Sequence, residues 1–242
     1  MKYMGSKARI ARYILPIILE NRKKDQWYVE PFVGGANMID KVTSNRIGGD
    51  SNEYAIGALQ LIKDHPDSLP KDQTETDEVF YKKMKKSLNV GLKGYYGFAL
   101  SYGGKWFGGW RRDSSNKRDY VAESYRSAIK QSPKLKGVFF FLCNYAEIFT
   151  PPDSIIYCDP PYKSATTYKG TFNHVEFWEW CREKVRAGHK VFISEYIAPN
   201  DFKCVWSKEI NSSLTRNTGS KKGIERLFVH NTQLIIQKEV RI

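Results

Sequence analysis

Long apolar segments are missing from this 242-residue sequence: no run reaches 18 apolar residues, and Met1 is followed by the polar stretch "KYMGSK". A membrane-spanning helix needs about 20 mostly apolar residues, and a secretory signal peptide needs an apolar segment near its start. The sequence therefore predicts a soluble, cytoplasmic protein without a membrane-inserted segment.

Metal-binding and redox motifs are also missing. The four cysteines are widely spaced without a Cys-x-x-Cys pair, and the four histidines lack metal-ligand spacing. This pattern argues against a zinc module and favours free thiols in a reducing compartment. We expect no bound metal. The residues concerned are Cys143, Cys158, Cys181, Cys204, His65, His174, His189 and His230.

Two common catalytic signatures are absent as well. No serine–histidine or cysteine–histidine pairing is evident, which disfavours a hydrolase with an activated nucleophile. Gly34 and Gly35 lack the G-x-G-x-x-G spacing of a dinucleotide fingerprint, which disfavours an NAD-dependent enzyme. The sequence is instead rich in positive charge, because 39 lysines and arginines against 26 acidic residues give a net charge of +13. This surplus favours a polyanionic partner, either nucleic acid or an anionic membrane surface.

Strand-like and helix-like stretches alternate along most of the chain, which predicts an α/β fold with a mainly parallel sheet covered on both faces. An apolar stripe with helical spacing in residues 8–19 predicts the first helix, in which Pro16 is a kink or a stop. Further helices are predicted at 37–43, at 52–64 and after Asn173 as N-cap. Residues 27–35 are predicted to form a strand that runs into a glycine turn, and further strands are predicted at 46–50, 138–143, 154–159, 190–196, 202–210, 225–231 and 233–239.

The middle of the chain has a different composition. Between Lys82 and Arg118 there are ten basic residues and one acidic residue, and seven glycines and seven aromatic residues fall between Gly91 and Trp110. We therefore expect an insertion at 59–136, which separates a first part of the α/β domain, 1–58, from a second part, 137–242.

Two stretches carry the residues for a ligand site. "EPFVGGAN", residues 30–37, places Gly34 and Gly35 directly after a strand, and Asp50 ends the next one. Glycine lets a backbone approach a ligand closely, and an acid at the end of the next strand, here Asp50, can accept hydrogen bonds from ribose hydroxyls. A plain turn and a helix cap are the alternative interpretations of these residues.

The second stretch is "IIYCDPPYKS", residues 155–164. Proline rigidity would fix the Asp159 carboxylate and the Pro160 carbonyl in place. Two fixed acceptors suit an exocyclic amino group, because each of them can accept a hydrogen bond from one of its two N–H groups. The nitrogen lone pair is then directed at an electrophile. Tyr162 can stack on the ring that carries the amine. A strand followed by a proline-stiffened loop is the alternative.

The order "KYMGSK", "EPFVGG" and then "DPPY" after an apolar strand resembles the Dam-type family of DNA adenine-N6 methyltransferases, the D12 class. The resemblance implies a Rossmann-like, S-adenosylmethionine-dependent methyltransferase sheet with an inserted target-recognition domain, found in a bacterium or a phage-infected cell. It assigns Asp159, Pro160 and Tyr162 to the flipped adenine. It assigns cofactor contacts to Tyr3, Lys7, Phe32, Gly34, Gly35, Asp50 and Asp159. Ala36 stands where the family often has glycine, and Tyr3 where it often has tryptophan.

The basic, aromatic middle would then serve DNA. A methyltransferase has to extract its adenine from the duplex, which needs contacts to phosphates and bases and a side chain to fill the vacated space. The basic candidates for DNA binding are Lys93, Lys105, Arg111, Arg112, Lys117 and Arg118, and the aromatic candidates are Tyr95, Tyr96, Tyr102, Trp106 and Trp110. We expect a hairpin here. The alternative is that about half of the aromatic residues form a small core and most lysines a solvated face. A second basic loop, 212–223, is a plain loop or a further DNA contact.

Three functions remain open. The favoured one is site-specific adenine-N6 methylation of duplex DNA, as part of restriction-modification or phage DNA modification. The second is an enzyme for cytosine-N4 or an RNA amine, because Asp-Pro-Pro-Tyr specifies only a planar ring with an amine. The third is a catalytically silent DNA-binding module of the same fold. Nothing in the sequence calls for more than a monomer or identifies the recognition sequence.

Overall fold

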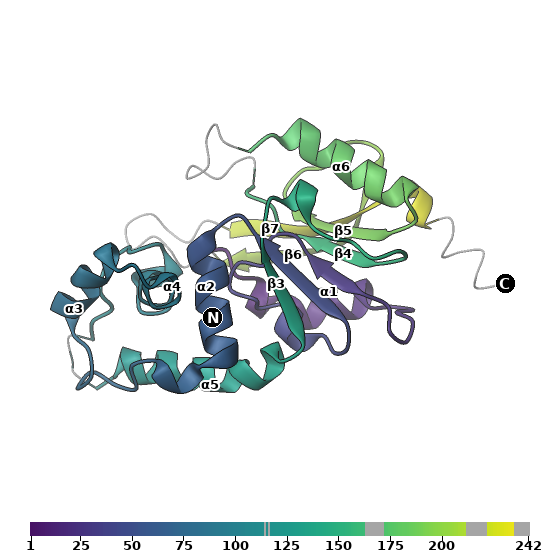
Figure 1. The fold of residues 1–242 in the computed structure, drawn as a ribbon. Coiled ribbons are helices and arrows are strands. Elements are labelled where there is room, and N and C mark those ends of the chain that lie inside the picture. Colours follow the sequence, from purple (N-terminus) through teal and green to yellow (C-terminus); the bar gives the residue numbers. More distant parts are fainter. Residues whose placement is uncertain (114, 116, 163–171, 212–221, 235–242) are drawn as a thin grey trace.

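The computed structural model describes residues 1–113, 115, 117–162, 172–211 and 222–234, and their architecture is a seven-stranded sheet with helices on both faces (Figure 1). The strand order is β3-β2-β1-β4-β5-β7-β6. Strands β1 to β5 run parallel, whereas β7 is antiparallel to both β5 and β6. The strands are β1 (Tyr28–Glu30), β2 (Arg46–Asp50), β3 (Val138–Leu142), β4 (Ile155–Cys158), β5 (Lys190–Glu195), β6 (Phe202–Asn211) and β7 (Lys222–His230).

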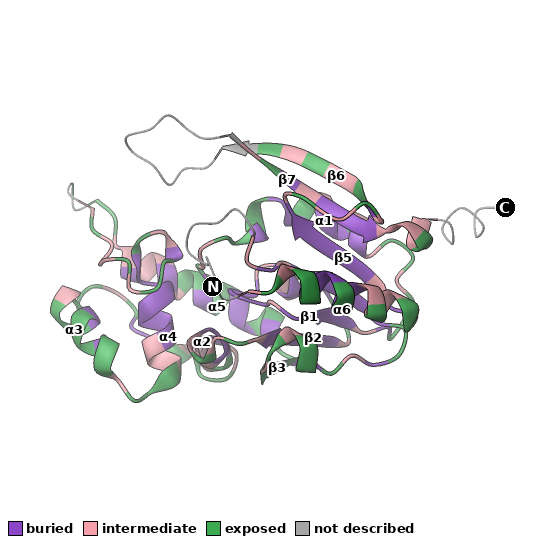
Figure 2. Ribbon diagram, turned by 90° about the horizontal axis from the view of Figure 1, so that it is seen from above, coloured by how far each residue is buried: buried purple, intermediate pink, exposed green. Residues whose placement is uncertain are grey.

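The order 3-2-1-4-5 of the parallel strands is that of a Rossmann-type sheet, so the predicted Rossmann-like α/β fold is confirmed. Figure 2 shows buried residues along the central strands and a mostly half-buried or exposed edge strand β6. The helices are α1 (Ala11–Ile18), α2 (Glu53–Asp64), α3 (Glu78–Lys83), α4 (Val90–Phe98), α5 (Tyr120–Leu135) and α6 (His174–Arg186).

Alternating residues of the central strands enter two separate cores. Tyr157 packs into the core that α1, α2, α4 and α5 cover, whereas its neighbours Ile156 and Cys158 pack beneath α6. Figure 1 shows α1 and α6 on opposite sides of the sheet accordingly. Because strands buried on both faces read as continuous apolar runs, this arrangement explains the "IIYC" stretch before Asp159. The predicted N-cap of α6 is confirmed, since the Asn173 side chain accepts hydrogen bonds from two backbone N–H groups of the first turn.

The middle of the chain is helical, and it packs through α2 and α5 onto the face that α1 also covers. Helix α2 runs across position 59, so the division of the chain at 59 and 137 stays a prediction. In place of the expected hairpin, the described residues contain a loop closed by one antiparallel bridge between Ser101 and Trp110. Tyr95 and Tyr96 are buried in the core, so these two are unavailable for stacking on a base.

Two local predictions are wrong. Residues 37–43 do not form an α-helix but contain a single 3-10 turn, Ile39–Lys41. The strand expected from 233 does not begin there either, because residues 231–234 are helical. The remaining residues of that predicted strand, from 235 onward, lie outside the described part of the chain, as do most residues of the basic loop 212–223. No helix in the described part is long and apolar enough to cross a membrane.

The close packing of α4 on α2 generates a stability prediction. A Cβ atom on Gly94 would lie 1.9 Å from the backbone oxygen of Tyr54, so no side chain fits there. We expect Gly94→Ala to lower the free energy of unfolding in urea by about 2 kcal/mol through overpacking, although alanine favours a helix by about 1 kcal/mol. Gly91→Ala is the matched control, because its nearest atom would be 3.0 Å away. Equal stability of the two variants would contradict this packing.

Candidate active site at the carboxyl ends of the strands

The predicted amine-binding residues lie directly beyond β4. All four residues of β4 are buried, and the chain continues into Asp159, whose side chain is 21% exposed, and the buried Pro160. The carboxylate therefore sits at the rim of the core rather than in open solvent. Its position beyond the carboxyl end of a parallel strand is the usual place for ligands in such sheets.

Lys7 joins the amino-terminal segment to this rim. The Lys7 side chain is only 8% exposed, and its ammonium nitrogen lies 3.0 Å from Asp159 Oδ1. The same nitrogen donates to the Gly5 carbonyl at 3.2 Å and lies 4.6 Å from the centre of the Tyr162 ring. A buried cation requires such partners, because an unpaired buried charge is costly. The sequence predicted both Lys7 and Asp159 as site residues, and the structure brings them into direct contact.

Glu225 completes the cluster and was missed in the sequence. It lies on β7, is 6% exposed, and accepts a 2.8 Å hydrogen bond from the Tyr162 hydroxyl. Its carboxylate is also 3.7 Å from the Lys7 nitrogen. A signal was available, because Glu225 lies on the same face of its strand as the buried Leu227 and Val229, at two-residue spacing. An acid at such an inward-facing position is unusual unless it is paired.

The charges in this cluster shift each other's protonation. Burial raises the pKa of Asp159 to about 6, against the opposing effect of the Lys7 ammonium. Burial lowers the pKa of Lys7, but the carboxylates of Asp159 and Glu225 raise it by more, so it stands above its usual value. Burial also raises the pKa of Glu30 well above its usual value; this carboxyl accepts a hydrogen bond from the Tyr28 hydroxyl at 2.8 Å. Such perturbed groups in one place are typical of functional sites.

The glycine turn lies beyond the neighbouring strand β1. Gly34 adopts a positive φ of 47°, and its N–H donates to Asp50 Oδ2 at 2.9 Å. Asp50 Oδ1 accepts from Asn52 N at 2.9 Å, which leaves further lone pairs of the carboxylate available. A Cβ atom on Gly34 would lie 3.0 Å from the Tyr3 ring, and one on Gly35 would lie 2.6 Å from the Met1 carbonyl. The turn, Asp50 and Tyr3 are thus in contact, and their assignment to a cofactor stays a prediction.

Phe32 belongs to an aromatic cluster next to the turn. Its ring stacks on Tyr145 with centroids 5.3 Å apart and meets Phe172 and Phe177 edge-on at 5.8 and 5.7 Å. Tyr145 follows β3 and Phe177 lies on α6, so the cluster gathers side chains from three separate parts of the fold. Flat rings beside a glycine turn and an acid can hold a nucleotide-like cofactor.

Of the six predicted DNA-binding cations, four contact acidic or aromatic side chains of the protein, and the other two lie exposed at the surface. Arg111 is largely covered, with an 11% exposed side chain, and its guanidinium lies 4.2 Å from the centre of the Tyr120 ring. Lys93 lies over the Tyr54 ring. Arg112 pairs with Glu78, and Arg118 forms hydrogen bonds of 2.8 and 2.9 Å to Glu123. Lys105 and Lys117 are exposed. The assignment of all six to DNA stays a prediction.

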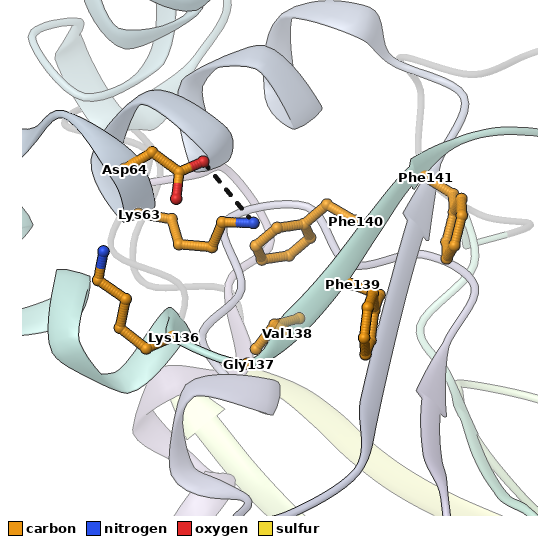
Figure 3. Close-up of a pocket in the computed structure, with 8 residues that line it drawn as sticks. All are labelled: Lys63, Asp64, Lys136, Gly137, Val138, Phe139, Phe140 and Phe141. Atoms are coloured by element: carbon orange, nitrogen blue, oxygen red, sulfur yellow. Dashed lines mark ion pairs between the residues drawn. The ribbon is translucent and has the colours of Figure 1, made fainter.

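A pocket in another part of the molecule is lined by none of the predicted site residues. It lies between the carboxyl end of α2 and strand β3, where Lys63 and Asp64 form an ion pair above Val138 and the phenylalanines that follow (Figure 3). In the described part of the chain, no group of three or more histidine, cysteine, aspartate or glutamate residues could hold a metal ion.

The Lys7–Asp159 pair generates a prediction on protonation. We expect the Asp159 carboxyl to titrate near pH 6 in the wild-type protein, and at higher pH in Lys7→Met, because the cation that lowers its pKa is removed. Carbon-13 NMR of the labelled aspartate carboxyl groups measures both values. Lys23→Met is the control, since Lys23 pairs with Asp153 at the surface. An unchanged Asp159 titration in Lys7→Met would contradict the pairing.

Comparisons with known proteins bear on this site. The family model of the D12 class N6 adenine-specific DNA methyltransferases matches residues 3–96, which include the glycine turn, Asp50 and Lys7. The chain is 26% identical over 218 residues to the Type II methyltransferase M.FokI of Planomicrobium okeanokoites. This match covers 75% of the chain and 31% of the relative, so the chain spans about a third of the length of that relative.

Two solved structures are more distant. The tRNA (m1A58) methyltransferase TrmI of Aquifex aeolicus is 10% identical with a TM-score of 0.41, and the match covers 95% of this chain and 72% of TrmI. SMU.472, in complex with SAH, is 11% identical with a TM-score of 0.36, covering 93% of this chain and 52% of SMU.472. Such low scores carry no argument about fold or function. The family model and the M.FokI match, by contrast, confirm the predicted resemblance of the chain to the D12 class of N6 adenine-specific DNA methyltransferases.

Proposed function

We propose that the protein is an S-adenosylmethionine-dependent methyltransferase that modifies the N6 amine of adenine in duplex DNA. The observation that carries this proposal is the Asp159 carboxylate, held at the carboxyl end of β4 beside Pro160 and Tyr162. The match of the amino-terminal residues to an adenine-specific family supports the choice of adenine. Cytosine-N4 or RNA amines are the alternative substrates, since the same three residues suit any planar ring with an amine.

The residues near the glycine turn fit the proposed cofactor. Gly34 and Gly35 pack closely against Tyr3 and the Met1 backbone, so the turn and Tyr3 would contact the cofactor together. Asp50 would accept hydrogen bonds from ribose hydroxyls, and Phe32 would contact the cofactor from the aromatic cluster. When bound, the cofactor would supply an activated methyl group on sulfur.

The task of the chain is to position a weak nucleophile. The Asp159 carboxylate and the Pro160 carbonyl would each accept one N–H of the amine, so that the nitrogen lone pair points away from both acceptors and toward the methyl group. Tyr162 would stack on the ring. When the amine receives the methyl group it would give up one N–H proton, which the Asp159 carboxylate would be placed to accept. Asp159 has to be deprotonated to accept the amine.

Base flipping requires contacts to the rest of the duplex. The net charge of +13 supports a nucleic-acid partner, and the exposed Lys105 and Lys117 lie in the inserted region. Tyr102 is 60% exposed there, which leaves its ring accessible to stack on or replace a base. Trp106 is 41% exposed, but its ring already stacks on Tyr54 with centroids 4.6 Å apart. Lys105, Lys117 and Tyr102 are therefore the strongest remaining candidates for the DNA surface.

The test of this function is transfer of labelled methyl from S-adenosylmethionine to unmethylated plasmid DNA, followed by nucleoside analysis. We expect label in N6-methyl-deoxyadenosine. Label in methyl-deoxycytidine would overturn the base assignment, and label only on RNA would overturn the substrate class. No label on either nucleic acid, with DNA binding intact, would favour a silent binding module.

The raised pKa of Asp159 predicts how activity depends on pH. Because the amine needs the deprotonated carboxylate, kcat/KM should rise as the pH increases through about 6 and level off above it. For an aspartate with an ordinary pKa, the rise would be complete near pH 5. The pH profile of kcat/KM with plasmid DNA measures this limb. A flat profile from pH 5 to 8 would contradict the proposed role of the carboxylate.

The exposed cations predict a change in salt dependence. Each lysine that contacts a phosphate contributes about one to the slope of log affinity against log salt. We expect the double variant Lys105→Glu/Lys117→Glu to weaken DNA binding and to reduce this slope by about two. Lys24→Glu is the control, because Lys24 is exposed before β1, at the amino ends of the parallel strands and away from the inserted region. An unchanged slope in the double variant would remove both lysines from the DNA surface.

A further inference from the structure

Glu225 stands apart from the residues that the family resemblance assigns. It is carried by β7, which pairs with β5 and not with the Asp159 strand, yet it meets both Lys7 and Tyr162. The four side chains thus form a continuous series in which Asp159 contacts Lys7, Lys7 contacts Glu225 and Glu225 contacts Tyr162. Two carboxylates share one cation here.

This arrangement answers a problem that the proposed reaction creates. Asp159 Oδ1 is 3.0 Å from the Lys7 ammonium, and the amine of the substrate needs oxygens of the same carboxylate. If the amine displaces Lys7, a cation that is only 8% exposed loses its main counter-charge, which is strongly unfavourable in a buried place. Glu225, at 3.7 Å, is already positioned to take over that charge.

Tyr162 creates a second requirement. Its ring has to keep one orientation to stack on a base, and the ring is fixed from two sides: the hydroxyl donates to Glu225, and the ring meets Tyr196 edge-on with centroids 4.5 Å apart. The Glu225 carboxylate therefore serves the tyrosine and the lysine at once.

We propose that Glu225 is a positioning residue of the methyl-transfer site: it anchors the Tyr162 hydroxyl and carries the counter-charge of Lys7, so that the Asp159 carboxylate is released to receive the amine. This inference rests on the proposed function. It assigns a role to a strand, β7, that carries none of the recognised motifs.

The effect of Glu225 on Asp159 gives the test its signature. Several groups act on the Asp159 carboxyl: Lys7 before α1, Glu30 on β1, Tyr157 on β4, Tyr162 after β4, Tyr196 after β5 and Glu225 on β7. Of these, Lys7 and, to a smaller extent, the Tyr162 hydroxyl lower the pKa of Asp159, and the Glu225 charge raises it. Removing the Glu225 charge should therefore lower the pKa of Asp159 and bind Lys7 to it more firmly.

Two substitutions separate the two roles of Glu225. Glu225→Gln keeps an amide oxygen that can accept from Tyr162 but removes the charge. We expect kcat about tenfold lower, a KM for plasmid DNA within about twofold of wild type, and an acid limb of the pH profile moved below that of wild type. Glu225→Ala also removes the acceptor, and we expect a larger loss of kcat. Adding Tyr162→Phe to Glu225→Ala should lower kcat by a smaller factor than Tyr162→Phe does in the wild-type protein, because the two side chains act as a unit.

Glu179→Gln is the matched control, since Glu179 is an exposed acid on α6 that pairs with Arg186. Wild-type kcat and pH profiles in both Glu225→Gln and Glu225→Ala would overturn the inference. An acid limb at the same pH as in the wild-type protein in Glu225→Gln would also overturn it. Thermal unfolding shows whether each variant folds, and Glu225→Gln carries the test if the alanine variant does not.

The inference can fail independently of the proposed function. If the wild-type protein transfers no methyl group to DNA, the proposed function fails, and carbon-13 NMR of Asp159 still decides the role of Glu225. A lower Asp159 pKa in Glu225→Gln would support the counter-charge role, and an unchanged one would overturn it.

Discussion

The structure depends on one buried ion pair, between the Lys7 ammonium and the Asp159 carboxylate at 3.0 Å. It links the first residues of the chain to the carboxyl end of β4, about 150 residues later in the sequence. Removing one member of such a pair commonly costs about 3–5 kcal/mol, because the other charge stays buried without compensation. Stability alone does not explain retaining this pair, since apolar side chains of similar volume often serve as well. The chemical task that we propose for the carboxylate would explain it.

The Rossmann-like sheet brings the parts of this task together. Parallel strands end at one edge, so the glycine turn after β1, Asp50 at the end of β2 and Asp159 after β4 all reach the same side. The amino-terminal segment then covers the turn with Tyr3 and reaches Asp159 with Lys7. In this arrangement, the residues assigned to the cofactor and those assigned to the amine meet through Lys7, which contacts the amine site directly.

The sequence predicted what is local or repeated. An apolar strand ending in an acid is visible in a few letters, and so are the glycine turn and the Asn173 cap. Contacts between distant elements were not visible. Glu225 reaches the site only because β7 pairs with β5. Arg118 is engaged only because its side chain forms a hydrogen bond to Glu123. The burial of Tyr95 and Tyr96 likewise follows from the packing of α4. The sequence alone did not predict it, because aromatic residues suit a core as well as a nucleic-acid surface.

The most direct measurement is the behaviour of Asp159→Ala in three assays: methyl transfer to unmethylated DNA, DNA affinity, and thermal unfolding. If the carboxylate holds the amine, the variant binds DNA and unfolds cooperatively but transfers no methyl group. Retained turnover in a folded Asp159→Ala protein would contradict the account, because the amine would then be held by other groups.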